Sequence, residues 1–468
     1  MSARRPTPPD AGPAVGPTPD LGAGWRAVLA LYGGAMGLAA PLVLGLRRAR
    51  GKEDPARLAE RLGRADRPRP AGPLVWLHAA SVGEAKSLLP LIETLAARTP
   101  APALLLTTGT VTSARAVAAV LPPGACHQFA PLDATGPMRR FLAHWRPDLS
   151  IRVESEVWPL MTLMPARAGV PMMLVNGRLS ARSAARWARL PGLARALFGA
   201  FAHVHVQDGE TAARLARLGV DPGVVSADGN LKTLLPPPGC DETERAALAA
   251  RLAGRPVWLA ASTHAGEEDA VLAAHRALAG RWPRLLTILA PRHPERAEAV
   301  TRLAGDLPLV RRSAGAPPPD AAGVWLADTM GEMGLWYRLA PVSLVAGSLA
   351  PRGGHNPFEP AALGSAILHG PDTRNFAPAY AALSAVGAAR AVADGAELGA
   401  ALAALLGPDG QRTAEAEAMC RAAPAALAPL KPDVLAMADR ALALMAPSPS
   451  APVPTRPSAP GAPAAPAA

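Results

Sequence analysis

The chain has 468 residues, of which 50% are hydrophobic and 18% are charged. This composition excludes an intrinsically disordered protein, and the length allows two folded domains. The formal net charge of +11 indicates an anionic partner, such as a nucleotide, a phosphorylated lipid or an acidic membrane surface. The three cysteines, Cys126, Cys240 and Cys420, are widely spaced and form no CxxC pair. Their spacing argues against a disulfide framework and against a zinc site.

A long apolar stretch follows a short flexible leader at residues 1–26. Residues 27–46 carry no charge, and a helix of about 20 apolar residues is long enough to cross a bilayer. Basic residues crowd the stretch 47–52, so the positive-inside rule places the rest of the chain in the cytoplasm. We expect one uncleaved N-terminal anchor helix. A signal peptide and a monotopic helix broken near Pro41 are the alternatives.

Short apolar runs alternate with longer segments of helical period through the rest of the chain. The expected strands are residues 74–78, 104–107, 149–153, 172–175 and 204–207, followed by 257–261, 285–290, 324–326 and 342–346. Residues 236–239, Pro-Pro-Pro-Gly, interrupt this pattern and indicate a linker. The rhythm predicts an α/β protein in which two domains, 47–235 and 240–446, face a cleft. The Pro/Ala-rich segment 447–468 is expected to be a disordered tail.

Ligands of open α/β sheets bind beyond the carboxyl ends of strands, and the first expected strand is followed by Ser81-Val82-Gly83-Glu84. A capping box would explain Ser81 and Glu84. It leaves unexplained a glycine inside the first helical turn, where its backbone freedom is costly. Close approach of a ligand would explain Gly83, and Glu84 is then a candidate catalytic carboxylate.

Three polar junctions in the second half suggest anion binding by loops that lead into helices. They are Ser262 to Glu268, Asp328 to Glu332, and Gly353 to Pro360. Simple capping explains each of the first two alone, whereas the Gly-Gly-His-Asn loop of the third suits a nucleotide-sugar. Nowhere does a GxGxxG follow a strand, and GxxxxGK[ST], HExxH and Cys/His ligand spacings are absent from the sequence, which argues against dinucleotide, NTP-hydrolysis and zinc mechanisms.

Residues 47 to about 425 resemble the family of 3-deoxy-D-manno-octulosonic acid (Kdo) transferases, glycosyltransferases of the GT-B fold. Nine ordered motifs carry the resemblance. They are Glu60-Arg61-Leu62-Gly63, His78 to Glu84, Glu154-Ser155-Glu156-Val157-Trp158-Pro159, Asn176 to Ser180, Gly229 to Lys232, Ala261 to Glu268, Pro291 to Arg296, Thr329 to Glu332, and Gly353 to Pro360 with Asn375-Phe376. The family commonly continues Gly-Asn-Leu-Lys with an aromatic and an acidic residue, and here Thr233 and Leu234 stand in those places.

The resemblance implies transfer of Kdo from CMP-Kdo to the lipid A precursor (lipid IVA) in lipopolysaccharide core biosynthesis, at the cytoplasmic side of the bacterial inner membrane. It implies an inverting, metal-independent displacement with no cofactor, in which Glu84 is the general base. No nucleic-acid partner is expected. The implied donor-binding residues are Lys232, Ser262, Thr263, Arg292, His293, Met330, Gly331, Glu332, Asn356 and Glu359. The implied acceptor-side or supporting residues are Ser81, Gly83, Glu154, Glu156, Asn176 and Arg178.

Two other readings stay open at this point. Another GT-B sugar transferase, or a nucleotide-sugar epimerase, would share the two-domain architecture. An inert membrane scaffold would keep the fold for binding alone.

Overall fold

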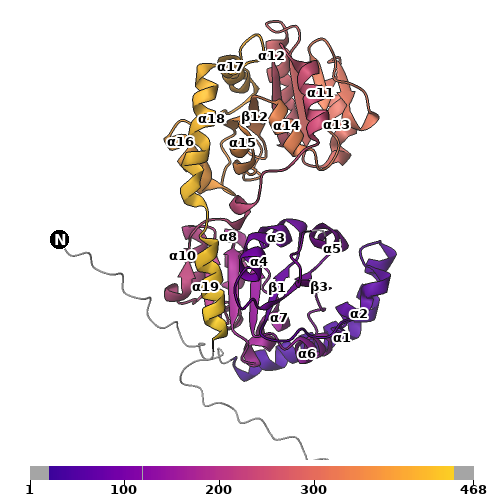
Figure 1. The fold of residues 1–468 in the computed structure, drawn as a ribbon, viewed down its shortest axis with the longest axis vertical. Coiled ribbons are helices and arrows are strands. Elements are labelled where there is room, and N and C mark those ends of the chain that lie inside the picture. The colour runs from indigo at the N-terminus through magenta and orange to yellow at the C-terminus, as the bar shows by residue number, and fades with distance from the viewer. Residues whose placement is uncertain (1–20, 119, 447–468) are drawn as a thin grey trace, which may run out of the picture. The chain divides into compact units, whose positions relative to one another are not determined.

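The computed structural model describes residues 21–118 and 120–446 of the chain. The expected tail at 447–468 and most of the expected leader, residues 1–20, lie outside this range. The chain divides into two compact units, shown in Figure 1: unit 1 extends to Ala227 and resumes at Asp433, and unit 2 is Asp228–Pro432.

Unit 1 is built on a parallel sheet of seven strands in the order β3-β2-β1-β4-β5-β6-β7. The strands are β1 (Leu74–Ala79), β2 (Ala103–Thr108), β3 (Cys126–Phe129), β4 (Leu149–Val153), β5 (Met172–Gly177), β6 (His203–Val206) and β7 (Val225–Ser226). Every residue of β1, β4 and β5 is buried. Helices cover both faces of such a sheet, and the strands therefore read as near-continuous apolar runs.

The helices of unit 1 connect successive strands, except the first two and the last. They are α1 (Ala23–Ala49), α2 (Leu58–Arg61), α3 (Val82–Ser87), α4 (Leu89–Ala96), α5 (Val111–Ala118), α6 (Thr135–Trp145), α7 (Pro159–Arg167), α8 (Ala181–Trp187), α9 (Pro191–Phe198), α10 (Gly209–Arg217) and α19 (Val434–Met445).

Unit 2 repeats the architecture with a parallel sheet in the order β10-β11-β9-β8-β12-β13-β14. Its strands are β8 (Val257–Thr263), β9 (Leu286–Pro291), β10 (Leu309–Arg311), β11 (Gly323–Leu326), β12 (Val342–Val345), β13 (Ala366–His369) and β14 (Ala389–Ala391). Its helices are α11 (Glu242–Leu252), α12 (Glu268–Ala279), α13 (Ala297–Ala304), α14 (Met333–Leu339), α15 (Phe358–Leu363), α16 (Ala377–Ala385), α17 (Gly395–Leu405) and α18 (Ala414–Leu427). The α/β class and the parallel sheets expected from the sequence are confirmed.

The boundaries of the units differ from the expected domains. The division falls at Ala227/Asp228, ahead of the proline run, and α19 belongs to unit 1 although the sequence pattern placed all of 240–446 in the second domain. There α19 lies beside α4 (Figure 1), where Arg98 pairs with Asp439 at 2.6 Å. The pattern of α19 shows only that the helix has an apolar face, and the partner of that face is not encoded locally.

Helix α1 contains the expected anchor segment and is long and apolar enough to span a membrane by length and composition. One side of it packs on α6 and α7. There Gly33 is so close to the start of α6 that an added Cβ would lie 2.3 Å from Thr135 Oγ1, and Tyr32 donates a 2.9 Å hydrogen bond to Asp133. The other side exposes leucines, among them Leu38 at 86% and Leu42 at 68%.

Candidate functional site

The strand order of unit 1 reverses between β1 and β4, the switch point at which ligands of such sheets bind. Glu84 follows β1, and Glu154 and Glu156 follow β4, so three expected site residues meet at this point. They are close enough to interact electrostatically, because the charges of Glu156 and Glu154 both raise the pKa of the Glu84 carboxyl.

The start of α3 holds Glu84 through a cap like the expected capping box, except that the Glu84 side chain bonds the N–H of Ala80 and not that of Ser81. Ser81 Oγ accepts a hydrogen bond from the Glu84 N–H at 3.3 Å, and Glu84 Oε2 accepts one from the Ala80 N–H at 2.8 Å. Burial raises the pKa of Glu84, and the negative charges of Glu156 and Glu154 raise it further against the opposing Ala80 hydrogen bond. A partly buried carboxylate with a raised pKa is suited to accept a proton near neutral pH.

The backbone conformation of Gly83 does not require glycine. Its φ is not positive, and a Cβ built on it would have no neighbour within 4 Å. Open space therefore lies beside the residue that precedes Glu84, and the approach of a ligand there stays a prediction.

The polar side chains of His78, Trp158 and Arg152 surround or stabilise Glu156. His78 Nε2 lies 3.6 Å from Glu156 Oε2, and Trp158 Nε1 donates to the same oxygen at 2.7 Å. Fully buried Arg152 stacks 3.8 Å over the ring of Trp76 and donates to the carbonyl of Met161. Burial alone would raise the pKa of Glu156, but the nearby His78, the hydrogen bond from Trp158 and the charge of Arg152 outweigh it and lower the pKa. Glu156 is thus kept as an anion close to Glu84.

Backbone strain marks several of the expected site residues. Among the described residues, positive φ at a non-glycine position occurs at Arg146, Glu154 (57°), Asn176 (55°) and Ser262 (59°). The last three directly follow or end strands at the carboxyl edge of their sheets. Left-handed backbone costs about 1–3 kcal/mol at such residues and clusters at functional sites.

A pocket of about 370 Å³ of empty volume, open at its mouth, lies in unit 1 beside these residues. Most of its buried lining residues are apolar, and the two exposed ones, Ser155 and Arg178, are polar, a mixture that is common in ligand sites. The lining residues are Glu154, Ser155, Val157, Leu174, Gly177, Arg178, Leu179, Ser183, Trp187, Phe198, Thr211 and Leu215. Glu154 and Arg178 thus lie on one pocket, whereas Asn176 is fully buried and does not line it.

In unit 2 the strand order reverses between β8 and β12, and one carboxylate ties the two following loops together. Glu267 is completely buried. It accepts hydrogen bonds from the backbone N–H groups of His264 (2.9 Å), Gly347 (2.8 Å), Ser348 (3.0 Å), Leu349 (2.9 Å) and Ala350 (3.2 Å). The neighbouring Glu268, also fully buried, pairs with Arg296 at 2.9 Å in the loop after β9. Two adjacent carboxylates therefore bind three loops together at the switch point.

The convergence brings basic side chains together. His264 Nε2 lies 2.9 Å from His355 Nε2, and the His264 and His293 rings are 6.0 Å apart. Burial lowers the pKa of His355 to about 4, with the charges of His264 and Arg292 acting in the same direction. The side chain of Arg292 is exposed, and its backbone N–H donates to the Thr263 carbonyl at 2.9 Å. With His355 uncharged at neutral pH, the features of this cluster that suit an anion are the guanidinium charge of Arg292 and the imidazole N–H groups near it.

The other expected donor residues lie in unit 2 and differ in their hydrogen-bond partners and in their exposure. Glu332 is already engaged by Arg312 at 2.7 Å and by Thr329, and therefore has less capacity for a ligand. Asn356 caps Phe358 and bonds Glu359, whose pKa is raised by burial. The remaining ones are Lys232 in a 3-10 turn, Ser262 and Thr263 at the end of β8, and Met330 and Gly331, which are exposed before α14. Helices α14 and α15 each begin later than the motifs suggested, at Met333 and Phe358.

Sequence reasoning assigned no role to His264, Glu267 or His355, although all three lie in the quoted motifs. It also missed the support of Glu156 by His78 and Arg152. Polar residues inside the otherwise apolar strands β1 and β4 are the signal that would have singled out the last two. Within the described ranges, no group of three or more His, Cys, Asp or Glu side chains is arranged to hold a metal ion.

Comparison with known proteins agrees with these motifs. A family profile described as 3-deoxy-D-manno-octulosonic-acid transferase matches residues 56–235. The chain is 36% identical to a 3-deoxy-D-manno-octulosonic acid transferase of Haemophilus influenzae, over 72% of this chain and 80% of the relative. It is 38% identical to the Bordetella pertussis protein of the same name, over 73% of this chain and 82% of the relative.

Solved structures agree on the fold. The UDP-GlcNAc 2-epimerase of Neisseria meningitidis matches 80% of this chain and 99% of its own, with a TM-score of 0.52 and 12% identity. That of Methanocaldococcus jannaschii matches 74% and 98%, with a TM-score of 0.51 and 13% identity. The fold is therefore of the GT-B type, and the chain is a glycosyltransferase that belongs to the 3-deoxy-D-manno-octulosonic acid transferase family.

Proposed function

We propose that the protein transfers Kdo from CMP-Kdo to the lipid A precursor in lipopolysaccharide core biosynthesis. A glucosamine hydroxyl of the acceptor attacks the anomeric carbon of Kdo, the bond to the CMP phosphate breaks, and CMP leaves with the bonding electrons. Glu84 takes the proton of the attacking hydroxyl. Direct attack inverts the anomeric centre, and neither a metal nor a cofactor takes part.

The observation that carries this proposal is Glu84 itself. It stands at a topological switch point with a raised pKa and open space beside Gly83. General-base catalysis by such a group contributes typically about 10² to 10⁴ in rate. The mixed polar and apolar lining of the adjoining pocket supports an amphipathic acceptor.

The basic cluster of unit 2 supports an anionic donor. The leaving group is a phosphate monoester, so positive charge and N–H donors stabilise it without a general acid. Arg292 and His293 are exposed, and the ring of His264, which contacts His355, lies 6.0 Å from that of His293.

The exposed apolar side of α1 and the basic residues after it support attachment to the cytoplasmic leaflet of the inner membrane, where an anionic surface attracts them. Because the opposite side of α1 packs on α6 and α7, we favour insertion along the membrane surface over a crossing span.

The test is transfer of Kdo from CMP-Kdo to a tetra-acylated lipid A precursor by detergent-solubilised protein, with products identified by mass spectrometry. Glu84→Gln should lower kcat by about 10² or more. Glu93→Gln, the same change at an exposed position on the neighbouring α4, is the matched control and should leave kcat unchanged. No product from folded wild-type protein would overturn the donor and acceptor assignment, and assays with other nucleotide-sugars would then separate another GT-B transferase or an epimerase from an inert scaffold.

A further inference from the structure

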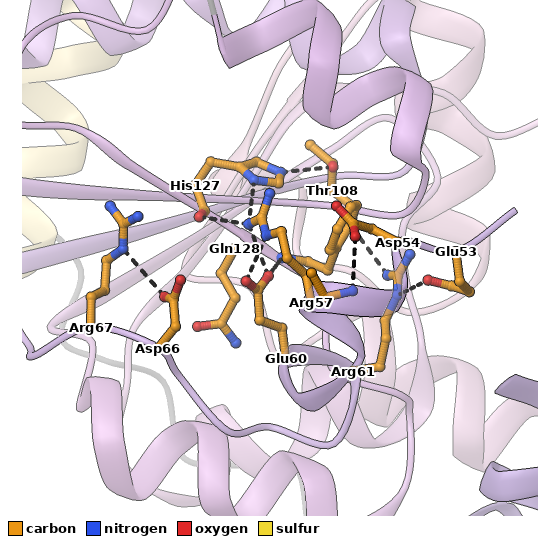
Figure 2. A network of polar contacts seen from close by, with 12 residues as sticks. Glu53, Asp54, Arg57, Glu60, Arg61, Asp66, Arg67, Thr108, His127 and Gln128 are labelled. Atoms are coloured by element: carbon orange, nitrogen blue, oxygen red, sulfur yellow. Dashed lines mark hydrogen bonds and ion pairs between the residues drawn. The ribbon is translucent and has the colours of Figure 1, made fainter. Parts of the chain in front are cut away.

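The segment that follows α1 forms a buried network of charges, shown in Figure 2. Glu53 and Arg61 are 6% and 4% exposed, and Arg61 Nε donates to Glu53 Oε2 at 2.9 Å. Arg47, in the last turn of α1, pairs with the other oxygen of Glu53. Charges are taken out of water at a high cost, so this arrangement persists only because each is paired and hydrogen-bonded.

The remaining N–H groups of Arg61 reach the carboxyl edge of the unit 1 sheet. Nη1 donates to the carbonyls of Thr108 at 3.3 Å and Ala130 at 3.2 Å, and Nη2 donates to the carbonyl of Gly109 at 2.8 Å. These carbonyls lie at or just after the ends of β2 and β3. A single guanidinium therefore fixes the loop that begins at Gly109.

Gly109 supports the residue that orients Glu84. A Cβ added to Gly109 would lie 2.9 Å from the Ala80 carbonyl oxygen and 3.3 Å from Ala80 Cα, so the two backbones are in direct contact. The N–H of Ala80 donates to Glu84 Oε2 at 2.8 Å. A continuous path of contacts thus runs from Arg61 through Gly109 and Ala80 to Glu84.

We propose that Arg61, held in place by Glu53, is a positioning residue for Glu84 in the Kdo transfer proposed above. This role depends on Glu84 being the base, and it gives a physical reason for the Glu60-Arg61-Leu62-Gly63 motif. Through Arg47, the same network joins α1 to the backbone at Gly109 and Ala80, which orients Glu84.

Unit 2 offers a matched control for a merely structural role. Arg255 is also 4% exposed and caps three carbonyls, those of Arg284 (2.7 Å), Pro319 (2.7 Å) and Ala321 (3.2 Å). These carbonyls precede β9 and β11, at the amino edge of their sheet, away from the loops that carry the candidate site.

The experiment compares Arg61→Lys with Arg255→Lys in full-length, detergent-solubilised protein. A lysine keeps the charge but cannot bond three carbonyls with the geometry of a guanidinium. Both variants should lose similar thermal stability. Only Arg61→Lys should lower kcat, by about 10- to 100-fold, with the KM for CMP-Kdo within about twofold of wild type, because misplacement of a catalytic group by about 1 Å costs this much.

Gly109→Ala is the second variant, since it leaves the Glu53–Arg61 pair intact and displaces Ala80 directly. It should reproduce the fall in kcat. In both variants, weakening of the Ala80 hydrogen bond should move the acid limb of kcat/KM to higher pH, while Glu154 and Glu156, the charged groups that act on Glu84, are unchanged.

The inference is overturned if Arg61→Lys and Gly109→Ala keep the kcat of an active wild type, or if Arg255→Lys loses kcat equally. Wild-type protein that transfers no Kdo would instead overturn the proposed function, and this inference with it.

Discussion

Replacement of Gly83 by alanine should separate stability from activity. Gly83 lies in the first turn of α3, its φ is not positive, and an added Cβ would meet no protein atom within 4 Å. Alanine is favoured over glycine in helices by up to about 1 kcal/mol, with the smaller values at exposed ends. The variant should therefore be as stable as wild type or more so, by up to about 1 kcal/mol in denaturant unfolding.

Activity should fall in the same variant, because the new methyl group occupies the open space beside Gly83, the residue that precedes Glu84. If the acceptor hydroxyl approaches through this space, a displacement of about 1 Å lowers kcat about 10²-fold. The assay is Kdo transfer under saturating donor, with unfolding curves measured on the same preparation. A matched control is Gly280→Ala, at the end of α12, where an added Cβ also meets nothing within 4 Å. Full activity in Gly83→Ala would refute the reasoning that a ligand fills this space.

Three further predictions concern charge, loop order and the membrane. Glu156→Gln removes a negative charge that raises the pKa of Glu84, so the acid limb of kcat/KM should move to lower pH; an unchanged limb would show that Glu156 does not act on the base. Glu267→Gln removes the charged acceptor of five backbone N–H groups and should lower the free energy of unfolding in urea by at least about 3 kcal/mol. In the fraction that folds, the KM for CMP-Kdo should rise at least tenfold. An unaltered KM would contradict the role of Glu267 in ordering the donor loops. The double variant Leu38→Asp, Leu42→Asp should keep the free energy of unfolding within about 0.5 kcal/mol of wild type, because both side chains are exposed. It should no longer sediment with anionic vesicles. Retained binding would show that this face of α1 does not contact lipid.

Local patterns in the sequence determined much of the fold. All nine expected strands are present within a residue or two, since each is mostly buried and apolar residues predominate in all of them but β6. The strands that were missed, β3, β7, β10, β13 and β14, are at most four residues long. Strands β3, β7, β10 and β14 carry too few apolar residues to register as a period, whereas β13 is as apolar as β12 and was missed.

The sequence by itself also determined the Ser81–Glu84 cap and the family motifs, because a cap joins residues three apart in the chain. Only the tertiary structure decided which motifs meet. Glu84 lies near Glu154 and Glu156 because β1 and β4 are neighbours in the sheet, and Glu267 bonds N–H groups 80 to 83 residues away. The role of Arg61 and the return of α19 to unit 1 were likewise set by distant partners. Propensity and periodicity act over a few residues, whereas strand order and the burial of charge are properties of the whole sheet.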